Sequence, residues 1–191
     1  MIRKTTLALA AAAAALLGAT AASAQTEGAT DTSTRTFQVT GNVPVICAGG
    51  TLSGGDSTFA MGVLVNTTTG LLRTDLSAPD KTLSGAFCSA RSTISIAATR
   101  MTAQSATGAA PAGFSNSVDF TATASGWTTT PASVNTAASS NPAATQSRTT
   151  PFSGDIVVGL SNFATTGGTT LRPVADSSYL GSVTVTLTAA N

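Results

Sequence analysis

Apolar and polar side chains alternate with a period of two residues along several stretches of this chain. The longest run covers residues 34–47, and one of its faces consists of Phe37, Val39, Gly41, Val43 and Val45. Neighbouring side chains of a β-strand point to opposite faces of the sheet, so this run predicts a strand with one apolar face and one polar face. The alternation limits the chain to β-rich folds.

The same alternation predicts further strands at 59–65, 83–98, 118–125, 156–160 and 179–188. Turn-forming clusters of Gly, Asn, Asp and Ser separate most of these runs. In the last run one face consists of Val183, Val185 and Leu187. The pattern predicts an all-β fold, an antiparallel β-sandwich of about seven strands, with no helix after the N-terminal segment.

One internal range, 128–151, has low sequence complexity and three prolines. It contains almost no large apolar side chain that could enter a core. We therefore expect a long exposed loop at 128–151.

The first 24 residues have the three parts of a secretory signal peptide. Arg3 and Lys4 precede an apolar stretch, and Ala22, Ser23 and Ala24 form a small-x-small cleavage site before Gln25. We expect cleavage between Ala24 and Gln25, a flexible polar leader at 25–33 and a sandwich domain at 34–191. Export through the inner membrane follows, without stable membrane insertion after cleavage.

Charged residues make up only 9% of the chain. Removing the signal peptide takes two of the nine basic residues and leaves seven against eight acidic ones, a net charge of −1. A neutral chain has no basic surface for phosphate groups, so nucleic acid is not an expected partner.

The chain has two cysteines, Cys47 and Cys88, and no histidine. In an exported protein a disulfide is the expected state of such a pair, with two buried thiols as the alternative. Two thiolates do not complete a tetrahedral metal site, so neither a metal nor another cofactor is expected.

Catalytic motifs are not recognisable. Without histidine no Ser-His-Asp or Cys-His arrangement can form, and the carboxylates lie in turn-like contexts or, for Asp119 and Asp155, at expected exterior or strand-edge positions. The single tryptophan, Trp127, is expected to pack in the core or at its rim, with stacking on a sugar as the alternative. We expect a protein that is not an enzyme.

The layout of the chain resembles a known family. An amphipathic N-terminal strand runs into Cys47, Cys88 precedes the strand Arg-Ser-Thr-Ile-Ser-Ile, and a Tyr-x-Gly-x-Val-x-Val-x-Leu strand lies near the C-terminus. This layout is similar to that of the spore coat protein U-like domain and of archaic chaperone–usher pilus subunits. The resemblance covers most of residues 37–187.

The resemblance implies an immunoglobulin-like sandwich that lacks one strand and is completed by donor-strand exchange. It implies a donor face of Phe37, Val39, Gly41 and Val43 within 34–45, and an acceptor-groove strand with Val183, Val185 and Leu187 that also pairs with a chaperone. The implied partners are like subunits, a periplasmic chaperone and an outer-membrane usher. The implied location is the periplasm in transit and then the cell surface or the extracellular space, in a fibre that serves adhesion or biofilm formation.

A second interpretation belongs to a different functional class. Residues 34–45 could pair within their own chain, which would make the protein a monomeric, self-complemented secreted binding module of unknown ligand. Alternation alone does not separate the two, because a regular strand can close either sandwich.

Export is predicted to remove residues 1–24, because the charged, apolar and small-residue regions stand in the order that signal peptidase recognises. The intact mass of the exported protein should match a chain that begins at Gln25. A mass that still includes Arg3 and Lys4 would contradict this prediction.

Overall fold

The computed structural model describes residues 32, 34–106 and 108–190. Apart from one 3₁₀ turn at Pro142–Ala144, all regular structure in these residues is β-strand. The predicted all-β class is therefore confirmed. The predicted signal peptide and most of the polar leader lie outside the described residues.

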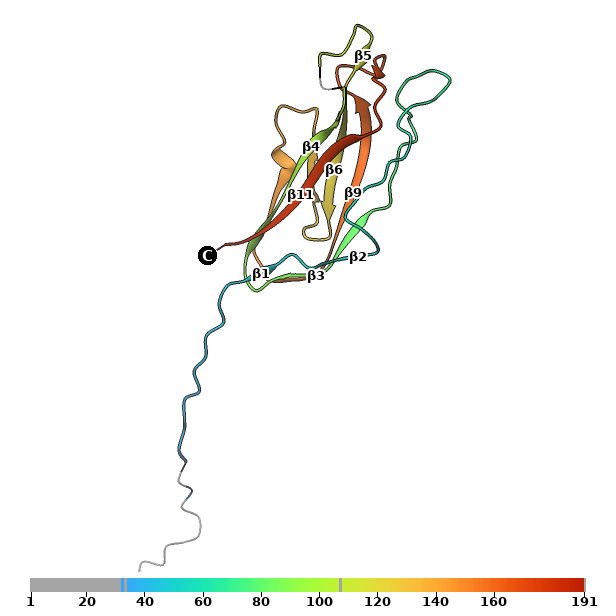
Figure 1. Cartoon of the computed structure of the whole chain (residues 1–191). Coiled ribbons are helices and arrows are strands. Elements are labelled where there is room, and N and C mark those ends of the chain that lie inside the picture. Colours follow the sequence, from blue (N-terminus) through green and yellow to red (C-terminus); the bar gives the residue numbers. More distant parts are fainter. Residues whose placement is uncertain (1–31, 33, 107, 191) are drawn as a thin grey trace, which may run out of the picture. The chain divides into compact units, whose positions relative to one another are not determined.

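The main sheet is antiparallel and contains nine strands. Its path runs β1-β3-β9-β6-β4-β11, while β2 pairs with β3, β7 with β6 and β8 with β4. The strands of the path are β1 (Cys47–Ala48), β3 (Lys81–Cys88), β9 (Phe152–Thr165), β6 (Ser117–Ser125), β4 (Ser92–Ala103) and β11 (Tyr179–Ala189). The side strands are β2 (Thr51–Ser53), β7 (Ala132–Asn135) and β8 (Thr145–Arg148). Figure 1 shows β4, β6, β9 and β11 alongside one another.

The sheet curls because single strands change partners along their length. β4 pairs with β8 through Ser92–Ser95 and with β6 only at Met101 and Thr102. β6 in turn pairs with β7 beyond that point. The result is a sandwich-like arrangement with one apolar interior. A small second sheet joins β5 (Phe114–Ser115) to β10 (Arg172–Pro173) in parallel.

The core lies between the curled parts of the sheet. Its buried side chains alternate along the strands as the sequence predicts, with Ile94 and Ile96 on β4, Val118, Phe120, Ala122 and Ala124 on β6, and Ile156 and Val158 on β9. Trp127 has no exposed surface and its ring lies 4.3 Å from that of Phe152. The core position predicted for Trp127 is confirmed, and a buried indole has no face free for a sugar.

Two predicted strands are not formed. The range 34–47 has no strand pairing before β1, which begins at Cys47. The range 59–65 has only one isolated bridge, between Val65 and Leu72. Gly62 has a φ of +65°, which interrupts the extended backbone that a continuous strand there would require.

Two other boundaries differ from prediction. The range 83–98 contains two strands, β3 and β4, because the chain reverses at 89–91 and Cys88 becomes the last residue of β3. The range 128–151 is not a loop throughout. It contains β7, the 3₁₀ turn and β8, and its small residues Ala132 and Val134 are buried. The pairing of β7 with β6 and of β8 with β4 stabilises this range, although it has few large apolar side chains.

Asp119 does not occupy the exterior position predicted for it. Its side chain is buried and accepts hydrogen bonds from the hydroxyls of Thr136 (2.9 Å) and Thr166 (2.6 Å). The guanidinium of Arg100 lies 3.3 Å away. Because a buried carboxylate requires such partners, Asp119 joins β4, β6 and two turns. Asp155 is exposed as expected and accepts a bond from the Gly85 amide.

Replacing Trp127 with Ala should lower the free energy of unfolding by about 3–5 kcal/mol, because it removes the largest fully buried side chain. Urea denaturation followed by circular dichroism measures the change. Phe114→Ala is the matched control, since 41% of Phe114 is exposed, and it should cost much less. Equal losses in the two variants would contradict the assignment of the core.

Candidate functional site

β11 is the long edge strand of the main sheet. β11 pairs with β4 over ten residue pairs, from Tyr179↔Ala103 to Ala189↔Ser92. Among the described residues, no strand pairs with its other edge. From Ser182 to Ala189 this strand has no proline, no charged side chain and no register shift. Natural edge strands usually carry prolines, charged side chains or bulges that prevent pairing with another strand. Because β11 lacks these features from Ser182 to Ala189, this part of its edge can accept another strand.

The apolar face of β11 is only partly covered. Val183, Val185 and Leu187 are half-buried and pack against the core, whereas their β4 partners Ile94 and Ile96 are buried. On the opposite face Thr184, Thr186 and Thr188 are exposed. The predicted acceptor residues therefore lie on one strand and one face, at the margin of the core.

A groove runs along the first half of this edge. It has a volume of about 490 Å³ and lies between β11 and the segment 57–61. Its described lining is uncharged: Ser57, Thr58, Phe59, Met61, Met101, Phe120, Leu160, Tyr179, Leu180, Gly181, Ser182 and Val183. A second hollow of about 660 Å³ adjoins it and shares Phe59, Met61, Met101 and Tyr179.

The opposite wall of the groove has little backbone support. Residues 57–61 belong to no strand, so side chains hold this segment. The Lys81 ammonium lies 5.8 Å from the centre of the Phe59 ring and 3.4 Å from the Asp56 carboxylate. The Thr58 amide, and then Lys81, hold the pKa of Asp56 below its ordinary value. A wall fixed by side chains can move more easily than one fixed by a hydrogen-bonded ladder.

Tyr179, the first residue of β11, lines both the groove and the adjoining hollow. Its hydroxyl donates to the Val174 carbonyl at 2.9 Å. Burial, and then the charge of Asp176, raise the pKa of Tyr179. The amides of Ser178 and Ala106 hold the pKa of Asp176 below its ordinary value. Tyr179 therefore remains neutral at physiological pH.

A β-bulge shapes the start of β11. The register with β4 shifts between Leu180 and Ser182. A Cβ atom on Gly181 would lie 2.7 Å from the Thr99 carbonyl oxygen, so glycine is required there. The bulge leaves Leu180 60% exposed at the groove.

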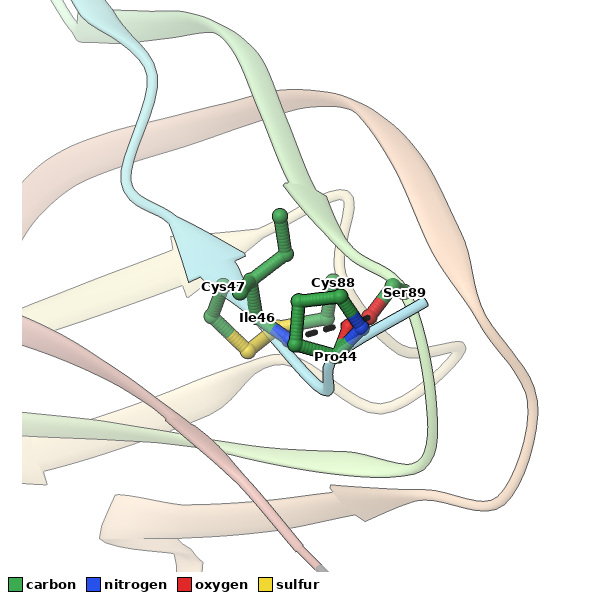
Figure 2. Close-up of a disulfide and its surroundings, with 5 residues drawn as sticks. All are labelled: Pro44, Ile46, Cys47, Cys88 and Ser89. Atoms are coloured by element: carbon green, nitrogen blue, oxygen red, sulfur yellow. Dashed lines mark hydrogen bonds between the residues drawn. A yellow bond between two sulfur atoms is a disulfide. The ribbon is translucent and has the colours of Figure 1, made fainter. Parts of the chain in front are cut away.

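Residues 44–47 join the N-terminal segment to the sandwich, and we call them the root of that segment. Hydrogen bonds and a disulfide fix this root to the end of β3 and the turn that follows it. Cys47 and Cys88 form a disulfide, which confirms their predicted pairing. The Ser89 hydroxyl accepts a hydrogen bond from the Ile46 amide (3.0 Å) and donates one to the Pro44 carbonyl (3.2 Å), as Figure 2 shows. The Ser89 amide also donates to the Ile46 carbonyl at 2.9 Å.

The predicted donor residues Phe37, Val39 and Val43 form no strand and keep 83%, 97% and 80% of their surfaces exposed. A Cβ atom on Gly41 would meet no neighbour within 4 Å. Their role as donors stays a prediction.

The alternation found β11 and its apolar face but missed the remaining groove residues. Phe59 and Met61 were expected in a strand, and Met101, Phe120 and Leu160 come from three different strands. Ser89 has no recognisable sequence signal, because its role depends on the turn that brings it to Pro44.

Within the described residues, no group of three or more His, Cys, Asp or Glu side chains is arranged to hold a metal ion. The same part of the chain contains no helix long and apolar enough to cross a membrane. A scan against family models finds no match, and searches of the curated proteins and of the solved structures find none.

The double replacement Cys47→Ser and Cys88→Ser should lower the free energy of unfolding by about 4 kcal/mol, the chain-entropy value for cysteines 41 residues apart. Chemical denaturation of the oxidised protein and of the variant measures the difference. An unchanged denaturation midpoint would contradict a stabilising role for the bond.

Proposed function

We propose that this protein is a secreted structural subunit of a surface fibre, assembled by β-strand complementation. The edge of β11 accepts the segment 34–45 of a second copy. The observation that supports this proposal is the edge of β11, which has no strand partner among the described residues and is regular from Ser182 to Ala189, with an uncharged groove along its first residues, 179–183. An added strand would gain backbone hydrogen bonds along the edge and pockets for alternate side chains.

The segment 34–45 matches β11 in length and the groove in chemistry. It has twelve residues, and β11 has eleven. From Thr36 to Val45 it contains no charged side chain, as the described lining of the groove contains none. Its apolar positions recur every second residue, as do Val183, Val185 and Leu187 on β11. Gly41 suits a place where another backbone or a bulky side chain approaches closely.

Before assembly, the same edge requires protection against unspecific pairing. In an exported subunit a periplasmic chaperone strand would supply this cover, and an usher would direct the exchange. Fibre formation then places the sandwich at the cell surface, in adhesion or biofilm formation.

The apolar face of 34–45 should be essential for multimers, because its side chains enter the partner's groove. Phe37→Ala should cost on the order of 3–5 kcal/mol per junction if the ring is fully buried there. The weakened junctions should be seen as fewer SDS-resistant multimer bands in gels of the protein secreted by the native host. Thr36→Asp and Gln38→Lys, on the opposite face, are matched controls and should retain the ladders.

Variants of the acceptor strand β11 can be compared in the same way, by their SDS-resistant ladders. Val185→Lys places a charge on the half-buried apolar face of β11 and should abolish ladders, whereas Thr184→Lys lies on the exposed face and should retain them. Circular dichroism of each purified subunit confirms that it still folds.

Deleting residues 25–45 distinguishes this function from the monomeric module. For a fibre subunit, the deletion should leave a folded, disulfide-bonded domain that binds chaperone but does not multimerise. If the full chain is a sharp monomer and the deletion simply unfolds it, the segment completes its own sandwich. The fibre proposal would then be wrong.

A further inference from the structure

The turn at 89–91 links the root of the N-terminal segment to the end of β11. On one side, Ser89 holds Pro44 and Ile46 through the bonds in Figure 2. On the other side, the Ala190 amide donates to the Arg91 carbonyl at 3.0 Å, and the Arg91 Nε donates to the Ala190 carbonyl at 3.4 Å. Three residues thus connect the two places where a strand-exchanged subunit would be pulled.

The disulfide makes this link covalent. Cys47 and Cys88 are 41 residues apart in sequence, but the disulfide joins them directly. Only the three residues 89–91 then separate Cys88 from Ser92, the first residue of β4. Because Ser92 pairs with Ala189, tension on Cys47 reaches the β4–β11 ladder by a short path.

Without the disulfide, tension on Cys47 would reach β3 and β4 only along the chain from residue 47 to residue 88, which few strand pairs hold in place. This path passes through β1, which has two residue pairs with β3, and β2, which has three. The residues of β2 are all exposed, and within the connecting residues 54–80 the only strand pairing is the isolated bridge between Val65 and Leu72. A pull on residue 45 would separate these pairs one after another, and beyond them only the partly buried Phe59, Met61, Leu64 and Leu72 hold residues 54–80 to the core.

We propose that the Cys47–Cys88 disulfide is a mechanical anchor that transmits tension from the N-terminal segment through the turn at 89–91 into β4 and β11. Because the disulfide carries this tension, β1, β2 and the range 54–80 are not extended by it. Use of this anchor in a fibre rests on the proposed function. The anchoring itself is a property of one subunit.

Single-molecule force spectroscopy on the isolated mature chain tests the anchor. One handle is attached at the N-terminus and the other at a click-reactive residue replacing Thr184, on the exposed face of β11, so that no new thiol is introduced. The oxidised chain should show no lengthening between Cys47 and Cys88 before β11 ruptures.

The variant with Cys47→Ser and Cys88→Ser should lengthen in an additional early step at lower force, by about 3.5 Å for each residue released. Reducing the folded wild-type chain with a phosphine in the same apparatus gives a second measurement that does not depend on folding of the variant. A single rupture at the same force in the oxidised and reduced chains would overturn the proposal.

Ser89→Ala separates the disulfide from the hydrogen-bond clamp. With the disulfide intact this variant should show no early step, and after reduction its early step should occur at lower force than in the reduced wild type. An early step in oxidised Ser89→Ala would assign the anchor to Ser89 and overturn the role of the disulfide. Because isolated subunits are pulled, the result is independent of whether the protein forms multimers.

Discussion

The structure depends on the pairing of backbone N–H and C=O groups across the main sheet, and the main path of that sheet ends at β1 and β11. Each strand between them has a partner on both sides over part of its length. β1 and β11 approach within 8 Å at some Cα atoms, yet they do not pair. β1 has only two residues, whereas β11 has eleven. The long unpaired edge therefore lies on the C-terminal strand.

The position of this edge determines the chemistry of the groove. β11 lies beyond β4, so its apolar face extends past the buried isoleucines of β4 and is covered only in part. The floor comes from β4, β6 and β9, and the far wall from a segment held by Phe59, Lys81 and Asp56. With no charged side chain in its described lining, the groove favours a neutral strand with alternating apolar residues.

The disulfide belongs to the same arrangement. It fixes the root of the N-terminal segment to the last residue of β3, beside the turn that leads into β4. In a strand-exchanged fibre each subunit gives one strand and receives another, so tension must cross every sandwich. The two-residue pairing of β1 is a weak connection for that purpose, and a covalent bond at the same residue strengthens it.

The sequence by itself determined the all-β class and the two faces of β11, and it predicted a disulfide between Cys47 and Cys88 and a place for Trp127 in the core or at its rim. These follow from period-two alternation, the cysteine count and side-chain size, which are local or compositional properties. The tertiary structure decided that 83–98 is two strands, that 128–151 contributes β7 and β8, and that Asp119 is buried. Each of these depends on partners distant in sequence: β9 beside β3 and β11 beside β4, β6 and β4 beside the low-complexity range, and Thr136, Thr166 and Arg100 around the carboxylate. It also decided that β11 has one edge without a strand partner in the described part of the chain, because alternation defines the faces of a strand and pairing between distant strands defines its edges.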